Sequence, residues 1–488
     1  MKRKIYMIGL WSVLLCCGCS DWLTIQPETS VTAETLFKTD VGVTQGLNGA
    51  YYIGKDVYGP VGRFGGGGNY TFVEVLANTY LVFAGSSNYL YANHLWEQMN
   101  TQDEVNVEIF RLPYNVIANL NSLINEMVKN QDGITPSVYN IVRGEALAYR
   151  ACCHLDLLRL YGPVPSAADV SKTYLPYVRI NDVDNYEYHT FNQYMDYLQA
   201  DLDSAEMFLA KSDPVLSVSF ESTNSTSITW PYRKSRMNYY GVLALQARAA
   251  LWRGDKDKAL RYARLVKEAL NEDGTSKFTF TTFDDDVSDY TRTDLSHYSE
   301  HICGIKNETF DALSISSPWR GESLYNTEAY LKELYGEDYA TDLRYVHFWK
   351  TNGGWSWDAD KGEYVWVATS ITIHRYDDFR PSLSSPHNFP IVRLPEMYFI
   401  IMECGTLAEA NSVYEEYCRA RGIDYVPLAE SNRQERIMLE SIREYAGEGQ
   451  NFFTYKRNNV RRMVGATTDC SEEQYIVPIP DKEFNDVK

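Results

Sequence analysis

Long segments with apolar residues at steps of three and four positions run through most of this chain. The segment 107–129 places its apolar residues on one helical face: Ile109, Phe110, Leu112, Val116, Ile117, Leu120, Leu123, Ile124 and Met127. The same spacing predicts helices over 137–161, 190–209, 235–252, 256–270, 394–410, 412–421 and 431–447. Short turns separate several of these segments, so neighbouring helices are expected to pair antiparallel. The chain is therefore predicted to be mostly α, built from helical hairpins.

One hairpin has the small residues of a known helical repeat. In the segment 237–270, a turn at Arg253-Gly254-Asp255 joins two predicted helices. Small residues fall where the two helices cross: Ala247, Ala250, Gly254, Ala259 and Ala263. This arrangement is typical of a tetratricopeptide repeat, so the scaffold is predicted to be tetratricopeptide-like.

Two stretches interrupt the helical pattern, at 78–102 and 277–390. Loops this long are usually functional or disordered, and their aromatic content argues against disorder. The second stretch holds half of the ten Trp residues, and the chain has 38 Tyr. Flat aromatic faces can cover the apolar side of a sugar ring, while planar polar groups bind its hydroxyls. The candidate ligand-binding residues are Tyr70, Phe72, Asn78, Tyr80, Tyr89, Tyr91, Trp96, Trp319, Arg320, Tyr325, Trp355 and Trp357.

The net charge and the absence of catalytic motifs exclude two classes of function, nucleic-acid binding and catalysis. The formal net charge is −19, and dense basic clusters are confined to two short places, so nucleic acid is not an expected partner. The chain contains no nucleophile elbow, zinc-protease helix or phosphate-binding glycine loop, so it is predicted not to be an enzyme. No metal cluster or cofactor is expected. Two acidic runs offer oxygen ligands for a structural calcium ion: Asp284-Asp285-Asp286, and Asp358 with Asp360 and Glu363.

The N-terminus is typical of an exported lipoprotein. A basic start, an apolar run of about 13 residues and then Gly18-Cys19 predict a signal peptide over 1–18. Cys19 is the predicted lipidation site and the new first residue. Acyl chains on Cys19 would hold the protein to a membrane.

Ordered motifs along the chain resemble those of the SusD/RagB family of outer-membrane nutrient-binding lipoproteins of Bacteroidetes. They are Cys19-Ser20-Asp21-Trp22-Leu23, Gly49-Ala50-Tyr51-Tyr52, Gly144-Glu145-Ala146-Leu147-Ala148-Tyr149-Arg150-Ala151, Leu160-Tyr161-Gly162-Pro163-Val164-Pro165, Arg393-Leu394-Pro395-Glu396-Met397-Tyr398 and Tyr475-Ile476-Val477-Pro478-Ile479-Pro480. The resemblance implies a tetratricopeptide-like scaffold with a long loop-rich insertion. The expected regions are a signal peptide (1–18), an N-terminal helical region (19–276), the aromatic-rich insertion (277–390) and a C-terminal helical region (391–488).

The resemblance also implies a function at the cell surface. Members of the family bind glycan or peptide and deliver it to a SusC-like TonB-dependent transporter of the outer membrane. The expectation for this chain is a surface-exposed lipoprotein that binds an oligosaccharide, with peptide binding as the alternative and a glycan-active enzyme as the second. The matching motifs belong to the scaffold, so no binding residue is carried over from the family.

Overall fold

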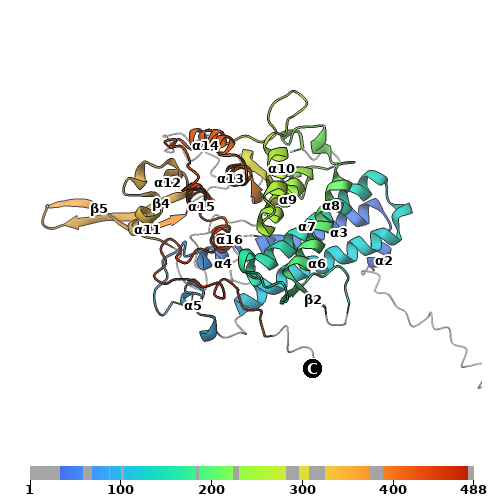
Figure 1. Cartoon of the computed structure of the whole chain (residues 1–488), viewed down its shortest axis with the longest axis horizontal. Helices are drawn as coiled ribbons and strands as arrows, with labels where there is room; N and C mark the ends of the chain where they lie inside the picture. The colour runs from blue at the N-terminus through green and yellow to red at the C-terminus, as the bar shows by residue number, and fades with distance from the viewer. Residues whose placement is uncertain are drawn as a thin grey trace, which may run out of the picture.

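The computed structural model describes residues 33–58, 69–86, 88–99, 104–182, 186–223, 230–281, 296–306, 325–373 and 388–481. Helices dominate this part of the chain (Figure 1). In the first half they are α2 (Ala33–Leu36), α3 (Asp40–Tyr58), α4 (Asn69–Leu76), α5 (Tyr89–Ala92), α6 (Glu104–Lys129), α7 (Pro136–Tyr161) and α8 (Phe191–Leu209). In the second half they are α9 (Tyr239–Arg253), α10 (Lys256–Lys267), α11 (Glu328–Tyr335), α12 (Leu343–Phe348), α13 (Leu394–Cys404), α14 (Leu407–Arg421), α15 (Arg433–Glu444) and α16 (Asn451–Arg457).

The long helices pack against their neighbours in the chain. Helix α7 lies between α6 and α8, α9 pairs with α10, and α13 contacts both α10 and α14. Almost every residue of α7 after Ile141 is buried, because other elements cover this helix on all sides. The prediction of a mostly α fold made of helical hairpins is confirmed.

The predicted repeat unit is the hairpin α9–α10. Ala247 and Ala250 on α9, and Ala259 and Ala263 on α10, are all buried. Gly254 ends α9 with φ of +89°, a conformation that glycine adopts without a steric penalty. Small side chains therefore let the two helices approach closely, as the sequence indicates.

Two helix boundaries differ from the prediction. Helix α9 begins at Tyr239 instead of residue 235, because the Asn238 side chain accepts a hydrogen bond from the Gly241 N–H and caps the helix there. The segment predicted as one helix over 394–410 is broken at Gly405. Thr406 then caps α14 by accepting a hydrogen bond from the Glu409 N–H.

The insertion 277–390 contains more regular structure than its composition indicates. Its described part includes α11, α12 and the strands β3 (His301–Lys306), β4 (Trp349–Asp358), β5 (Glu363–Ile373) and the first half of β6 (Asn388–Arg393). The strands β1 (Thr173–Pro176) and β2 (Tyr188–Thr190) lie between α7 and α8. In the described residues the strands form three antiparallel pairs: β1 with β2, β3 with β6, and β4 with β5.

A buried network of ion pairs joins the insertion to the C-terminal helices. Arg421 at the end of α14 and Arg393 at the end of β6 both bind the carboxylates of Glu300 and Glu444. Arg393 also makes two hydrogen bonds to Glu448, at 2.8 and 2.6 Å. These five side chains are almost inaccessible to solvent, so the charges are compensated inside the protein. The network ties β6 and the segment before β3 to the helices α14 and α15.

Candidate functional site

The β4–β5 hairpin projects from the body of the molecule (Figure 1). Its strands alternate aromatic residues with small or β-branched ones, in Trp355-Ser356-Trp357 and in Tyr364-Val365-Trp366-Val367. Residues two apart in a strand lie on the same face, so the rings of each strand share one face. β-Branched and aromatic side chains also favour the extended backbone.

An acidic turn closes the hairpin at its far end. The Asp358 side chain accepts hydrogen bonds from the backbone N–H groups of Asp360 (3.0 Å) and Lys361 (3.1 Å). Gly362 has φ of +67° and donates its N–H to the Asp358 carbonyl. Asp358 thus stabilises a turn. The other acidic run, Asp284–Asp286, lies outside the described residues, and a calcium ion at either place stays a prediction.

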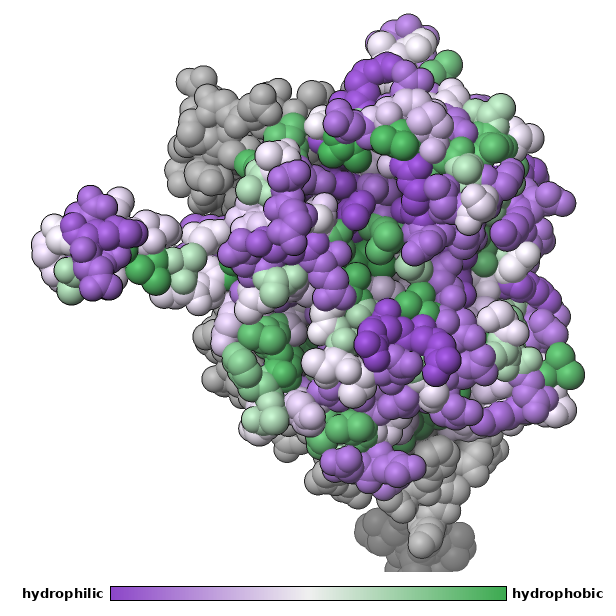
Figure 2. Space-filling view, turned by 60° about the vertical axis from the view of Figure 1, so that its left-hand side comes forward, coloured by the Kyte–Doolittle hydropathy of each residue, from purple (hydrophilic) through white to green (hydrophobic). Residues whose placement is uncertain are grey.

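The near end of the hairpin is embedded in the body. Trp349, Ile371 and Ile373 are buried there, and the Trp349 indole N–H donates to the Tyr335 hydroxyl. From Ile371 outward to Tyr364, seven residues at about 3.4 Å each extend the strand by about 24 Å. Figure 2 shows the hairpin standing clear of the body, with a hydrophilic tip. A two-stranded hairpin alone is marginal in water, so the buried base and the ring contacts must support it.

Four rings meet in cross-strand pairs on one face of the hairpin. Trp355 lies opposite Trp366, and Trp357 lies opposite Tyr364. The ring centroids are 5.9 Å apart in the first pair and 5.3 Å apart in the second, both edge to face. Such pairs contribute about 0.5–1.5 kcal/mol beyond the burial of their area. We call these four residues the ring ladder.

The ring ladder is open to solvent. The exposed fractions are 69% for Trp355, 56% for Trp357, 65% for Tyr364 and 50% for Trp366. Among the described residues, the structure gives no hydrogen bond to the three indole N–H groups or to the Tyr364 hydroxyl. The face therefore combines apolar rings with four polar groups that can bind a hydroxyl-rich ligand.

Gly353 leaves space for one ring of the ring ladder, that of Trp366. A methyl group at this position would lie 2.3 Å from the Val367 carbonyl oxygen and within 3.0 Å of the Trp366 ring. The register also shifts between Asn352 and Gly353, as at a β-bulge. The absence of a side chain lets the Trp366 indole lie over the backbone of β4.

Several rings predicted for the ligand are in the core instead. Phe72, Tyr80 and Tyr91 are 0%, 3% and 2% exposed, and Phe72 packs edge to face against Tyr91 at 5.2 Å. Their faces are covered by protein, so they offer no surface to a ligand in this structure. Aromatic composition alone does not separate rings that fill a core from rings that face solvent.

The other described candidates upstream of the insertion are Asn78, Tyr89 and Trp96. They are half-buried and make hydrogen bonds within the protein. The Trp96 indole N–H donates to the Gln474 carbonyl at 2.9 Å, which ties this segment to the C-terminal region. The Asn78 carboxamide donates to the Ala92 carbonyl at 3.0 Å. Tyr89 begins the short helix α5, and its carbonyl accepts from the Asn93 side chain.

The two irregular stretches meet at one place. The Tyr325 carbonyl accepts the Leu81 N–H at 2.9 Å, and the rings of Tyr325 and Phe83 lie 6.2 Å apart. Asn326 forms an isolated bridge with Ile371 near the base of the hairpin. Of the predicted residues, Tyr325 is therefore close to the hairpin base, while Trp355 and Trp357 are on the hairpin itself.

Four predicted positions cannot be placed in this way. Cys19, Trp319 and Arg320 lie outside the described residues, and so does the side chain of Tyr70. Conversely, Tyr364 and Trp366 belong to the ring ladder but are absent from the predicted set. The alternation of rings in Tyr364-Val365-Trp366, opposite Trp355-Ser356-Trp357 across an acidic turn, is the sequence signal that indicates them.

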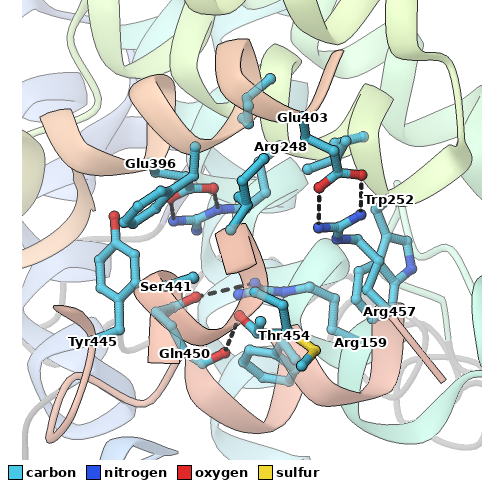
Figure 3. Close-up of a pocket in the computed structure, with 16 residues that line it drawn as sticks. Arg159, Arg248, Trp252, Glu396, Glu403, Ser441, Tyr445, Gln450, Thr454 and Arg457 are labelled. Atoms are coloured by element: carbon cyan, nitrogen blue, oxygen red, sulfur yellow. Dashed lines mark hydrogen bonds and ion pairs between the residues drawn. The ribbon is translucent and has the colours of Figure 1, made fainter. Parts of the chain in front are cut away.

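A second feature, a polar cleft of about 80 Å³, lies between α7, α9, α13, α15 and α16 (Figure 3). Arg248 makes a bidentate pair with Glu396 (2.7 and 2.6 Å), and Arg457 makes one with Glu403 (2.8 and 2.6 Å). Burial raises the pKa of Glu403, but Arg457, Lys256 and Gln434 together lower it by more, so the pKa lies below its usual range. The carboxylates of Glu396 and Glu403 are thus both ion-paired with guanidinium groups.

Three buried side chains, those of His297, Glu300 and Glu444, come together closely enough to hold a cation. The oxygens of Glu300 and Glu444, however, accept hydrogen bonds from Arg393 and Arg421 at 2.6–3.0 Å. Two positive guanidinium groups already compensate these carboxylates, so the cluster is best described as part of the buried ion network.

Comparison with known proteins agrees with the architecture. Residues 34–226 match a SusD-like family model described as starch-binding and associating with the outer membrane. Comparison with curated proteins finds no match. Among the described residues, no helix combines the length and the apolar character needed to cross a bilayer.

Solved structures with the same fold come from Bacteroides. A SusD superfamily protein from Bacteroides thetaiotaomicron has a TM-score of 0.68 at 17% identity, over 92% of this chain and 98% of that chain. One from Bacteroides vulgatus has a TM-score of 0.67 at 18% identity, over 91% and 96%. A laminarin-binding SusD-like protein has a TM-score of 0.61 at 15% identity, over 92% and 97%.

These likenesses cover nearly the whole length of both chains, so they establish the fold from end to end. The family model adds a match over residues 34–226, which is less than half of the chain. The chain therefore has the helical fold of the SusD superfamily structures, and residues 34–226 are similar to the SusD-like family.

Proposed function

We propose that this protein is a cell-surface lipoprotein that binds oligosaccharides through the ring ladder of its β4–β5 hairpin. The observation that carries the proposal is the exposure of four rings on one face, at 50–69%, beside unoccupied indole N–H groups. Exposed apolar faces of this kind mark interaction sites. The family description and the laminarin-binding neighbour support a carbohydrate as the ligand.

The charge of the site favours a neutral glycan. The hairpin turn carries Asp358, Asp360 and Glu363 against the single cation Lys361, which pairs with Asp358 at 3.4 Å. An anionic ligand near this turn would meet like charge, whereas a neutral sugar would not. Linear oligosaccharides also suit a row of rings, because successive sugar units can stack on successive side chains.

We propose binding without catalysis. Glycoside hydrolysis needs one protonated and one ionised carboxyl group across the substrate. In the polar cleft, Glu396 and Glu403 are both paired with guanidinium groups, so neither is available as the acid. The ring ladder has carboxylates only at its turn, where Asp358 binds the backbone.

Two further parts of the proposal follow from the family. Lipid-modified Cys19 anchors the protein at the outer surface of the outer membrane, and a SusC-like transporter receives the glycan. Changing Cys19 to Ala should move the protein into the soluble fraction and abolish its labelling with palmitate. Membrane retention in cells that lack the transporter would contradict the lipid anchor.

Calorimetry with a panel of neutral oligosaccharides tests the binding site. The variants are Trp355→Ala, Trp357→Ala and Trp366→Ala, and the matched control is Tyr52→Ala, an exposed aromatic on helix α3. Losing one stacking ring should remove about 1–3 kcal/mol, which is about a five- to 150-fold loss of affinity. Thermal melts show that each variant is folded. Equal affinity in all four variants would refute this site.

The open edges of the hairpin favour one alternative ligand, an extended peptide. In the described residues, the outer edge of β5 is bridged by Asn326 at Ile371, near the base of the hairpin, while β4 and the outer part of β5 pair only with each other. Backbone groups on these outer edges are available for strand addition. The same calorimetry decides between the two. Binding of unrelated peptides, without binding of any glycan, would favour this alternative.

A further inference from the structure

A groove of about 590 Å³ lies far from the hairpin, between the helices α6, α7 and α8 and the strand pair β1–β2. These elements lie together at the side of the molecule opposite the hairpin (Figure 1). Its volume is in the range of small-molecule sites, about 300–1,000 Å³. Helix α7 lines the groove with Arg143, Leu147 and Arg150, at positions i, i+4 and i+7 on one helical face.

Two guanidinium groups in this groove have no carboxylate partner among the described residues. No carboxylate oxygen of that part of the chain lies within 4.0 Å of Arg143 or Arg179, although the formal net charge of the protein is −19. The Nε atom of Arg143 is buried and makes no hydrogen bond. Arg179 is exposed and its guanidinium lies over the Tyr197 ring, 4.2 Å from the centroid. In an acidic protein, cations left without acidic partners in a cavity are unusual.

The third arginine of the groove is neutralised. Arg150 is buried and makes two hydrogen bonds to Asp201, at 2.7 and 2.6 Å. It also donates to the carbonyl of Arg179, which places Arg179 at the Arg150 end of the groove. Seven residues of helix separate Arg143 from Arg150, about 10 Å. The guanidinium groups of Arg143 and Arg179 therefore lie toward opposite ends of the groove. Of the two acids that line it, Asp201 is paired with Arg150, and Glu187 lies at the rim.

Neutral polar groups and rings complete the lining. The carboxamide of Asn125 makes no hydrogen bond within the described part of the chain, Tyr186 is exposed, and Tyr197 is partly exposed beneath Arg179. Burial lowers the pKa of His189; Glu187 opposes this shift, Arg179 adds to it, and the pKa lies below its usual range. The groove thus offers the guanidinium groups of Arg143 and Arg179, a planar amide and aromatic faces. Arg143 donates from one Nη atom to the Tyr139 hydroxyl and lies over the Phe208 ring, so its remaining N–H groups are the ones that could bind a ligand.

We propose that this groove is a second binding site, for a small oxyanion-bearing ligand such as an acidic oligosaccharide with carboxylate groups. Guanidinium forks bind carboxylate and other oxyanions through two parallel hydrogen bonds. The amide and the tyrosines suit the hydroxyls and the apolar side of a sugar ring. The site is independent of the ring ladder, whose acidic turn favours neutral glycans.

Calorimetry at low salt compares a uronic-acid disaccharide with its neutral counterpart, and with inorganic phosphate and sulfate. The variants are Arg143→Gln and Arg179→Gln. The matched control is Arg261→Gln, because Arg261 is also exposed and stacked on a tyrosine, Tyr262, at 4.4 Å, but lies outside the groove. We expect the acidic disaccharide to bind more tightly than the neutral one, and each groove variant to weaken it about tenfold or more.

A second readout separates binding from a structural effect. A bound anion favours the charged imidazole, so NMR titration should show a higher pKa for His189 when the acidic disaccharide is present. Comparable binding of phosphate would identify any small oxyanion as the ligand, and preference for the disaccharide would identify the sugar acid. Absence of binding by all three anions, or equal affinity in Arg143→Gln, Arg179→Gln and Arg261→Gln, would overturn the proposal. The hairpin variants should bind the acid normally, so the two sites can fail independently.

Discussion

Removing Arg421 should destabilise the protein strongly. Its side chain is fully buried and makes four hydrogen bonds of 2.9 Å, two to Glu300 and two to Glu444. The change Arg421→Met keeps an unbranched chain in the same space but leaves these two carboxylates with Arg393 as their remaining guanidinium. Breaking a buried ion pair from one side costs about 3–5 kcal/mol, because the remaining charge stays buried.

Arg419→Met is the matched control on the same helix. Arg419 lies two residues before Arg421, its side chain is 75% exposed, and it pairs with Glu415 at 3.4 Å. An exposed pair of this kind contributes about 0–1 kcal/mol. The assay is urea unfolding followed by far-UV circular dichroism, which reports the free energy of unfolding of each variant.

The pH dependence of the difference identifies its cause. Without Arg421, the buried carboxylates gain a proton more readily, so their pKa in the folded variant is raised above the unfolded value. A raised pKa favours the folded state at low pH, and this advantage is lost as the pH rises through the folded pKa. The destabilisation by Arg421→Met should therefore be smaller at pH 5 than at pH 8. A cost equal to that of Arg419→Met, or one that does not change with pH, would refute the reasoning.

Two more predictions concern single residues. Burial raises the pKa of Glu74 from 4.5 to about 7. Protonation of Glu74 therefore stabilises the folded protein at low pH, and this contribution to the free energy of unfolding is lost as the pH rises from about 4.5 to about 7. In urea unfolding, Glu74→Gln should make the free energy of unfolding less dependent on pH in that window and raise it at pH 8 by about 3 kcal/mol. An unchanged pH profile would contradict this. Gly353→Ala should displace the Trp366 ring and weaken both the near-UV circular dichroism of the ring pairs and glycan binding. Gly354→Ala, where a methyl group meets no atom within 4 Å, should leave both unchanged, and equal behaviour of the two variants would contradict the role of Gly353.

The helical part of the fold could be predicted because periodicity is a property of local sequence. The segments 107–129 and 137–161 reappear as α6 and α7 within a few residues. The errors occur where a single side chain ends or begins a helix. Asn238 and Thr406 cap their helices through hydrogen bonds to backbone N–H groups, and this choice between neighbouring residues depends on tertiary contacts.

The binding surface was harder to predict, for a physical reason. Tyr80 and Tyr91 come from a polar, aromatic segment and yet are buried, because their rings fill space against other core elements. Trp355 and Trp357 come from the aromatic-rich insertion and are exposed, on strand β4. Their partners Tyr364 and Trp366 emerge only when the strand register is known, because cross-strand pairing joins residues that are distant in sequence.

The groove between α6, α7 and α8 lies beyond what sequence alone could indicate. In the sequence, nothing distinguishes Arg143 and Arg150 from other residues of a predicted helix, and Arg179 follows a short strand. Only the fold shows that Asp201 pairs with Arg150 and that no acid among the described residues pairs with Arg143 or Arg179. Which charges remain unpaired is decided by three-dimensional neighbours, and composition carries no information about it.

The indole N–H signals of the Trp residues in the mature protein provide the most direct test of the ring ladder as the glycan site. In a ¹⁵N-labelled sample, each indole gives one signal, assigned by Trp→Phe substitution. On addition of a bound neutral oligosaccharide, the signals of Trp355, Trp357 and Trp366 should shift, while those of the buried Trp252 and Trp349 should not. Shifts confined to tryptophans outside the hairpin, with the three ladder signals unchanged, would contradict the account.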